Sequence, residues 1–239
     1  FGRNDKQITE MFQEIENIVF DLGGVLADLD MERCTAAFRA LGMPQVAEWV
    51  NPYYPAEVFA QLERGDCTPH EACERMRRIA GRPEVTDGQI AAAYRSFVVG
   101  LPVAKLRLLR ALRDAGKGVY MLSNNNEFVF PYIKETLFRA DGLVLEDYFD
   151  KCYLSYEMHE LKPSPAIFER MIADSGVCPE TTLFVDDGEK NIRTARDLGF
   201  QVYMPGPRED FRHLFDDMLC GAAGDPAPAE RAAVCGCRR

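Results

Sequence analysis

The chain has 239 residues, of which 47% are hydrophobic, and this is enough for one sizeable core with a smaller accessory domain. Its 38 acidic and 28 basic residues give a formal net charge of −10 without a Lys/Arg stripe, which argues against nucleic acid or an anionic membrane as a partner. No apolar run approaches the roughly 18 residues of a transmembrane helix, and no signal peptide is recognised. The 8 cysteines are irregularly spaced and are interpreted as reduced thiols, so we expect a cytoplasmic protein.

The first expected strand lies at residues 17–21, a short apolar run that ends at an acid and precedes two glycines. Residues 31–101 differ, because their apolar residues follow helical spacing and no convincing strand is recognised among them. Thr68 and Thr86 each begin a capping box ahead of an apolar periodic run. These signals predict a helical cap domain at residues 31–101, a bundle of about four helices inserted after the first strand.

The remainder of the chain alternates helices and strands. Helices are expected at residues 103–115, 163–175 and 189–198, and strands at 118–122, 152–155, 182–186 and 200–204. This alternation predicts an α/β fold, a doubly wound, mainly parallel sheet with a Rossmann-like core formed by residues 1–30 and 102–220. Residues 221–239 lack apolar periodicity and are predicted to be a disordered tail.

Four polar clusters follow the expected strands at or near their carboxyl ends, where open α/β sheets bind ligands. They are Asp21, the pair Ser123-Asn124, Lys162, and the pair Asp186-Asp187. With these clusters the chain resembles the haloacid dehalogenase superfamily, whose four motifs match residues 21–26 (DLGGVL), 122–124 (LSN), 162–163 (KP) and 184–187 (FVDD). Each motif alone is weak, but the four occur in the right order and strand context over residues 17–204.

A narrower resemblance rests on the phrases DLGGVLAD, LSNNN and DDGEKN at residues 21–28, 122–126 and 186–191. They are similar to the branch that contains α-glucose-1-phosphate phosphatases and the phosphatase domain of bifunctional epoxide hydrolases. The resemblance implies a phosphatase that acts on a small phosphorylated metabolite and requires Mg²⁺. It also leads us to expect a monomer or a weak homodimer.

The resemblance assigns Asp21 as the nucleophile that forms an aspartyl phosphate, which water then hydrolyses. Phosphate monoesters are doubly charged and repel a carboxylate, so cations must screen the phosphoryl oxygens. The expected metal ligands are Asp21, Asp187 and the Gly23 carbonyl, which together would hold Mg²⁺. Asp186 is expected either to hold a metal-bound water or to orient the site from outside the ligand shell.

The remaining motif residues are expected to bind the phosphoryl group or to support the site. The Ser123 hydroxyl and backbone donors near Asn124 would bind phosphoryl oxygens, and Lys162 would place positive charge opposite the metal. Asn191 lies four residues after Asp187 on the next expected helix, where it can fix either Lys162 or the acidic pair. The expected catalytic residues are therefore Asp21, Ser123 and Lys162.

The chain departs from the superfamily pattern at Gly23. Most phosphatases of the superfamily carry a second Asp at this position, which protonates the leaving alcohol and then activates water. Without that acid, a leaving group that needs little protonation is favoured, such as the anomeric hydroxyl of a sugar 1-phosphate. Asp28 and Asp30 stay open as substitute acids. Candidate substrate contacts in the cap are Arg64, Tyr53 and Tyr54, although surface or packing roles are favoured for all three.

Three other functions remain in competition with a phosphatase. A 2-haloacid dehalogenase attacks carbon and needs no divalent cation, so the pair Asp186-Asp187 counts against it. A phosphosugar mutase needs an acid/base at position 23, so Gly23 counts against that reaction. A weakly active phosphoryl-binding module would retain the site but would not complete the turnover of p-nitrophenyl phosphate.

Overall fold

The computed structural model describes residues 14–50 and 57–220. The predicted tail at 221–239 and two of the candidate substrate contacts, Tyr53 and Tyr54, lie outside these residues. None of the helices in the two described ranges is long and apolar enough to cross a membrane.

A parallel sheet of five strands forms the centre of the molecule, in the order β5-β4-β1-β6-β7. The strands are β1 (Asn17–Phe20), β4 (Gly118–Ser123), β5 (Lys151–Leu154), β6 (Thr182–Val185) and β7 (Gln201–Tyr203). The prediction of a doubly wound α/β sheet is thereby confirmed, with strand ends within two residues of those expected. Because β1 lies between β4 and β6, the residues that follow these three strands meet at one edge of the sheet.

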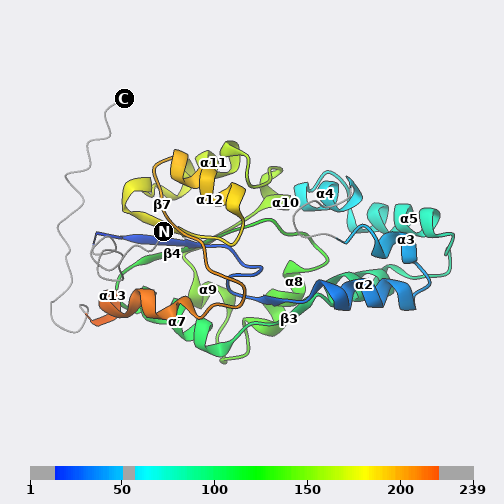
Figure 1. Ribbon diagram of the computed structural model, residues 1–239, viewed down its shortest axis with the longest axis horizontal. Helices are drawn as coiled ribbons and strands as arrows, with labels where there is room; N and C mark the ends of the chain where they lie inside the picture. Colours follow the sequence, from blue (N-terminus) through cyan, green and yellow to red (C-terminus); the bar gives the residue numbers. More distant parts are fainter. Residues whose placement is uncertain (1–13, 51–56, 221–239) are drawn as a thin grey trace.

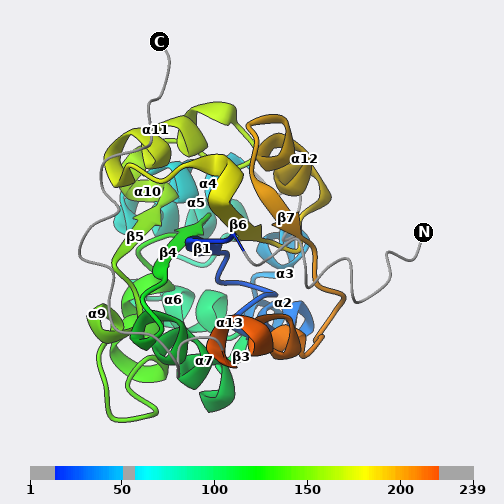
Figure 2. The same cartoon turned by 90° about the vertical axis from the view of Figure 1, so that its left-hand side faces the viewer.

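Helices cover both faces of the sheet (Figure 2). Strand alternation decides which side chains each layer receives. Ile18 and Phe20 are fully buried on the face of α7 (Val103–Asp114), η3 (Phe211–Phe215) and α13 (Asp216–Cys220). Val19 points to the other face, where it packs in one cluster with side chains of α11 (Pro165–Ser175) and α12 (Glu189–Asp197). Burial of each such side chain stabilises the fold by about 1.5–3 kcal/mol.

The inserted helices, α2 to α6, lie between β1 and β4 in the chain and form a separate group at one end of the molecule (Figure 1). Their bounds are α2 (Met31–Ala40), α3 (Pro44–Ala47), α4 (Glu57–Arg64), α5 (Pro69–Ala80) and α6 (Asp87–Arg95). Both predicted capping boxes are present, with Thr68 bonded to Glu71 and Thr86 bonded to Gln89. The described part of this segment thus holds five helices, one more than expected.

The two segments that connect the sheet with the inserted helices pair with each other as short β-strands. The strands are β2 (Asp28–Leu29) and β3 (Val98–Gly100), which pair antiparallel. The expectation of no strand within residues 31–101 is therefore wrong. A strand of three residues shows only one alternation, with Val98 buried and Val99 exposed, and this is too short to be recognised as a period of two.

Shorter helices complete the connections. They are α8 (Phe130–Tyr132), the π-helix η1 (Ile133–Leu137), α9 (Leu145–Tyr148), α10 (Ser155–Met158) and the 3-10 helix η2 (Pro179–Thr181). Of these, α10 matters most for the site, because it follows β5 directly and packs against α4 of the inserted helices.

Candidate active site

Three carboxylates converge at the carboxyl edge of the sheet. Asp21 follows β1, and Asp186 and Asp187 follow β6, so that one oxygen from each lies within 4.8 Å of the others. Backbone hydrogen bonds extend the sheet to these residues, because the Asp21 N–H donates to the Val185 carbonyl at 2.9 Å and the Asp186 N–H donates to the Tyr203 carbonyl at 3.2 Å. The sheet itself therefore fixes where the carboxylates stand.

Lys162 bridges two of the carboxylates. Its Nζ lies 2.8 Å from Asp21 Oδ1 and 2.6 Å from Asp186 Oδ2, and only 1% of its side chain is exposed. Burial disfavours the charged amine, but the charges of Asp186 and Asp21 outweigh this effect, and the pKa of Lys162 is raised. The lysine is therefore a permanent positive charge beside Asp21.

The hydrogen bonds of Asp186 engage both of its carboxylate oxygens. Oδ1 accepts from the Gly188 N–H at 2.7 Å and from Asn191 Nδ2 at 2.9 Å, while Oδ2 accepts from Lys162. Asn191 thus contacts the acidic pair, one of the two arrangements that its spacing left open. These contacts support the orienting role for Asp186, since its oxygens already have partners.

The site carries more negative than positive charge. Three carboxylates surround one ammonium group, which leaves a formal excess of two negative charges. Burial, opposed by Lys162 and reinforced by Asp186, raises the pKa of Asp21 to about 7. Burial, followed by repulsion from Asp186, also raises the pKa of Asp187. An all-oxygen cluster with unbalanced negative charge fits a hard divalent cation such as Mg²⁺.

The turn after Asp21 is packed against Asp187. Gly24 adopts a φ of +75°, and a Cβ atom at this position would lie 2.1 Å from Asp187 Oδ2. The adjacent Gly23 lines the same pocket. Glycine at position 24 therefore allows both the left-handed turn and the approach of the Asp187 carboxylate.

Gly24→Ala is expected to lower kcat/KM by at least about 100-fold, because displacing Asp187 removes a charge-stabilising group. Gly81→Ala is the matched control, since Gly81 has a φ of +65° and open space around the Cβ position. The control should lose about 1–2 kcal/mol of stability from left-handed strain but keep its activity. Steady-state kinetics and thermal unfolding of both variants check this, and equal activities would contradict the argument.

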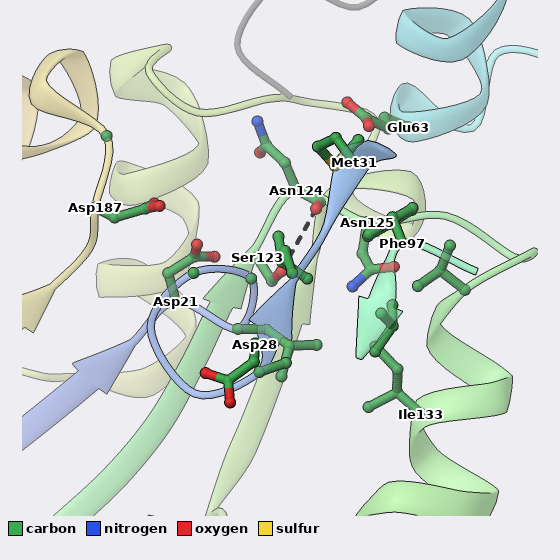
Figure 3. A pocket seen from close by; sticks show the side chains of 18 of the residues that line it. Asp21, Asp28, Met31, Glu63, Phe97, Ser123, Asn124, Asn125, Ile133 and Asp187 are labelled. Atoms are coloured by element: carbon green, nitrogen blue, oxygen red, sulfur yellow. Dashed lines mark hydrogen bonds between the residues drawn. The ribbon is translucent and has the colours of Figure 1, made fainter. Parts of the chain in front are cut away.

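Ser123 and Asn124 lie between the acidic cluster and the far end of the pocket (Figure 3). Among the described residues the Ser123 hydroxyl makes only a long contact, 3.5 Å to the Asn124 carbonyl, so it can donate to a ligand. The Asn124 side chain is already engaged, because its Nδ2 donates to the Lys162 carbonyl at 2.9 Å and its Oδ1 accepts from the Lys162 N–H at 2.8 Å. Asn124 thus positions Lys162, and phosphate binding by nearby backbone donors stays a prediction.

The pocket above these residues has a volume of about 500 Å³ and is lined by both the sheet edge and the inserted helices. Arg64, a candidate contact on α4, is not among its lining residues and pairs with Asp66 at 2.7 Å. The preceding residue, Glu63, lines the pocket instead. Consecutive helical positions point about 100° apart, so one faces the pocket when the next does not.

The two flap acids differ in position. Asp28 lines the pocket and lies 4.0 Å from Lys105 Nζ. Asp30 is the N-cap of α2, where its carboxylate accepts from the Glu32 N–H at 3.1 Å. Helix capping accounts for Asp30, so of the two only Asp28 stays open as a substitute acid.

A parallel α/β core with an aspartate after its central strand, a bridging lysine and an adjacent acidic pair is the arrangement expected for a hydrolase that attacks through a carboxylate. The chain belongs to the haloacid dehalogenase-like hydrolase family, whose model matches residues 15–199. The predicted family and the predicted class of enzyme, a hydrolase, are thereby confirmed.

Two bacteria provide relatives over most of the chain. D-ribitol-5-phosphate phosphatase from Bacteroides thetaiotaomicron is 38% identical over 198 residues, which cover 83% of this chain and 95% of that protein. A solved haloacid dehalogenase family enzyme of the same organism, in complex with magnesium and inorganic phosphate, is 41% identical, with a TM-score of 0.79 over 84% of this chain and 99% of that one. A predicted haloacid dehalogenase-like hydrolase from Porphyromonas gingivalis is 35% identical, with a TM-score of 0.77 over 89% of this chain and 100% of that one.

Proposed function

We propose that the protein is a Mg²⁺-dependent phosphatase that hydrolyses the phosphate monoester of a small sugar or sugar alcohol. The observation that carries this proposal is the cluster of Asp21, Asp186 and Asp187 around Lys162, beneath a pocket of about 500 Å³. The relative that acts on ribitol 5-phosphate and the solved relative with bound magnesium and phosphate support it.

In this proposal the Asp21 carboxylate attacks phosphorus, a P–O bond forms to Asp21, and the P–O bond to the leaving group breaks. Lys162 and the Ser123 hydroxyl hold phosphoryl oxygens in place as this happens. Water then cleaves the aspartyl phosphate and releases inorganic phosphate. A bound Mg²⁺, held by Asp21, Asp187 and the Gly23 carbonyl, would supply the positive charge that offsets the anionic substrate.

The choice of leaving group is the finer part of the proposal. The missing acid at Gly23 supports a leaving group of low pKa, such as the anomeric hydroxyl of a sugar 1-phosphate. The B. thetaiotaomicron relative, a phosphatase of D-ribitol 5-phosphate, supports a phosphate on a primary hydroxyl instead. We therefore propose the wider class, small sugar and sugar-alcohol phosphates, for a protein that is monomeric or weakly dimeric.

Phosphate release from p-nitrophenyl phosphate, ribitol 5-phosphate and glucose 1-phosphate should require Mg²⁺. Because the acidic cluster otherwise repels a phosphate dianion, EDTA is expected to lower kcat/KM by about 100-fold or more. A malachite-green assay with and without Mg²⁺ measures this. Equal rates in EDTA would contradict the Mg²⁺ requirement, whereas chloride release from 2-chloropropionate without metal would support a dehalogenase.

A further inference from the structure

Glu63 is a carboxylate of the pocket that the proposed chemistry does not use. It lies near the carboxyl end of α4, among the inserted helices, and lines the same pocket as Asp21. Figure 3 shows Glu63 at one end of the pocket and Asp21 and Asp187 at the other, with Asn124 between them. A substrate whose phosphate lies at Asp21 can therefore extend its leaving group along the pocket toward Glu63.

The main-chain carbonyls of Glu63 and Arg64 anchor the end of α4 to the sheet region. The Glu63 carbonyl accepts from Ser155 Oγ at 2.6 Å, and the same buried hydroxyl accepts from the Asn125 N–H at 2.9 Å. The next carbonyl, of Arg64, lies 3.0 Å from a ring nitrogen of His159. One serine thus ties Glu63 to the loop that follows Ser123, which fixes the spacing between the two ends of the pocket.

Gly65 allows this close approach. It has a φ of +70°, and a Cβ atom at this position would lie 2.3 Å from the Tyr156 carbonyl oxygen of α10. Only glycine fits both the left-handed conformation and the short distance to a neighbouring backbone. The packing of α4 on α10 therefore fixes the position of Glu63.

The Glu63 carboxylate makes no hydrogen bond or ion pair with any residue of the two described ranges. Burial raises the pKa of its carboxyl group to about 7. Burial, followed by the charge of Glu63, also raises the pKa of the Tyr94 phenol. A partly desolvated carboxylate without a partner among the described residues is unfavourable, and a ligand that donates hydrogen bonds to it removes this cost.

We propose that Glu63 binds hydroxyl groups of the leaving group, so that it selects neutral, hydroxylated phosphates and excludes those whose leaving group carries a second negative charge. A carboxylate accepts several hydrogen bonds, and hydroxyl groups are the donors of a sugar or sugar alcohol. An anionic leaving group would place like charges together in a partly desolvated pocket. This inference rests on the proposed phosphatase function and assigns the residue that recognises the substrate.

The test compares the wild type with Glu63→Gln and Glu63→Ala, assayed with Mg²⁺ at pH 8 on three substrates. Ribitol 5-phosphate has hydroxyl groups, 2-phosphoglycolate has a carboxylate, and p-nitrophenyl phosphate lacks both groups. Glu63→Ala should lower kcat/KM for ribitol 5-phosphate by about 10–100-fold, mainly through KM, because charge-assisted hydrogen bonds are lost. Glu63→Gln should lose less and should raise kcat/KM for 2-phosphoglycolate by about 10-fold.

Two controls separate recognition from folding. Neither variant should change p-nitrophenyl phosphate turnover by more than about 3-fold, since that substrate has no hydroxyl groups to bind. Glu57→Gln removes a charge from an exposed position of the same helix, where Glu57 accepts from Gln61 at 2.8 Å, and should leave all three rates unchanged.

The outcomes distinguish the inference from the function on which it rests. A wild type without Mg²⁺-dependent phosphate release from any of the three substrates overturns the proposed function. An active wild type overturns the inference alone if the Glu63 variants lose all three activities equally or leave 2-phosphoglycolate turnover unimproved. A wild-type preference for O-phosphoethanolamine over ribitol 5-phosphate would overturn the assignment to neutral hydroxyl groups.

Discussion

Asp21→Asn is expected to abolish turnover of every phosphate monoester while the protein stays folded. The amide has nearly the shape of the carboxylate but is not a nucleophile, so no bond to phosphorus can form. Removing the nucleophile of a covalent mechanism lowers kcat by about 10⁴-fold or more. Asp21 is 9% exposed and follows the central strand, so the substitution keeps the backbone bond to Val185.

Trapping the aspartyl phosphate tests the same assignment directly. Acid quenching during turnover, followed by reduction with borohydride, should convert the phosphorylated Asp21 into homoserine, which peptide mass spectrometry locates. Asp21→Glu keeps the charge but moves the carboxylate by one methylene group, and it should also be inactive because the attack geometry is lost. Substantial turnover by Asp21→Asn, or reduction at another acid, would assign the nucleophile elsewhere.

Local patterns were sufficient to predict the strands that hold the site and the capping boxes of the inserted helices. Asp21 and Asp186 each end a short apolar run, and the carboxyl ends of parallel strands lie at the same edge of the sheet. The capping boxes at Thr68 and Thr86 involve only residues three apart, so they are visible in the sequence. Asp21, Ser123, Asp186 and Asp187 end or directly follow strands, so they belong to this local category, whereas Lys162 does not.

The missed contacts that shape the pocket join residues far apart in the chain. Asn124 holds the backbone of Lys162 across 38 positions, and Ser155 holds the Glu63 carbonyl across 92. Which face of α4 meets the pocket depends on its packing against α10, and helical periodicity does not specify this. The sequence therefore offered Arg64 as a candidate substrate contact, although the pocket is lined by Glu63.

Asp187→Asn is expected to remove Mg²⁺-dependent activity and yet to stabilise the metal-free protein. Burial and the charge of Asp186 raise the pKa of Asp187, so its ionised form is disfavoured in the folded state relative to the unfolded chain. Above that raised pKa the ionised carboxylate destabilises the fold, and the neutral amide removes this effect. Loss of one charged ligand should lower kcat/KM by about 10³-fold, which corresponds to several kcal/mol.

Thermal unfolding at pH 7.5 in EDTA and in Mg²⁺ separates the two effects. A wild type at about 100 times its dissociation constant for Mg²⁺ gains about 2.7 kcal/mol, or roughly 5–10 °C. Asp187→Asn should unfold at a higher temperature than the wild type in EDTA but should gain little from Mg²⁺. Glu189→Gln is the control, because it removes an exposed charge that pairs with Arg193 at 3.1 Å and should keep the full metal response. A variant that melts lower in EDTA, or that retains the metal response, would show that Asp187 stabilises the fold instead of holding a cation.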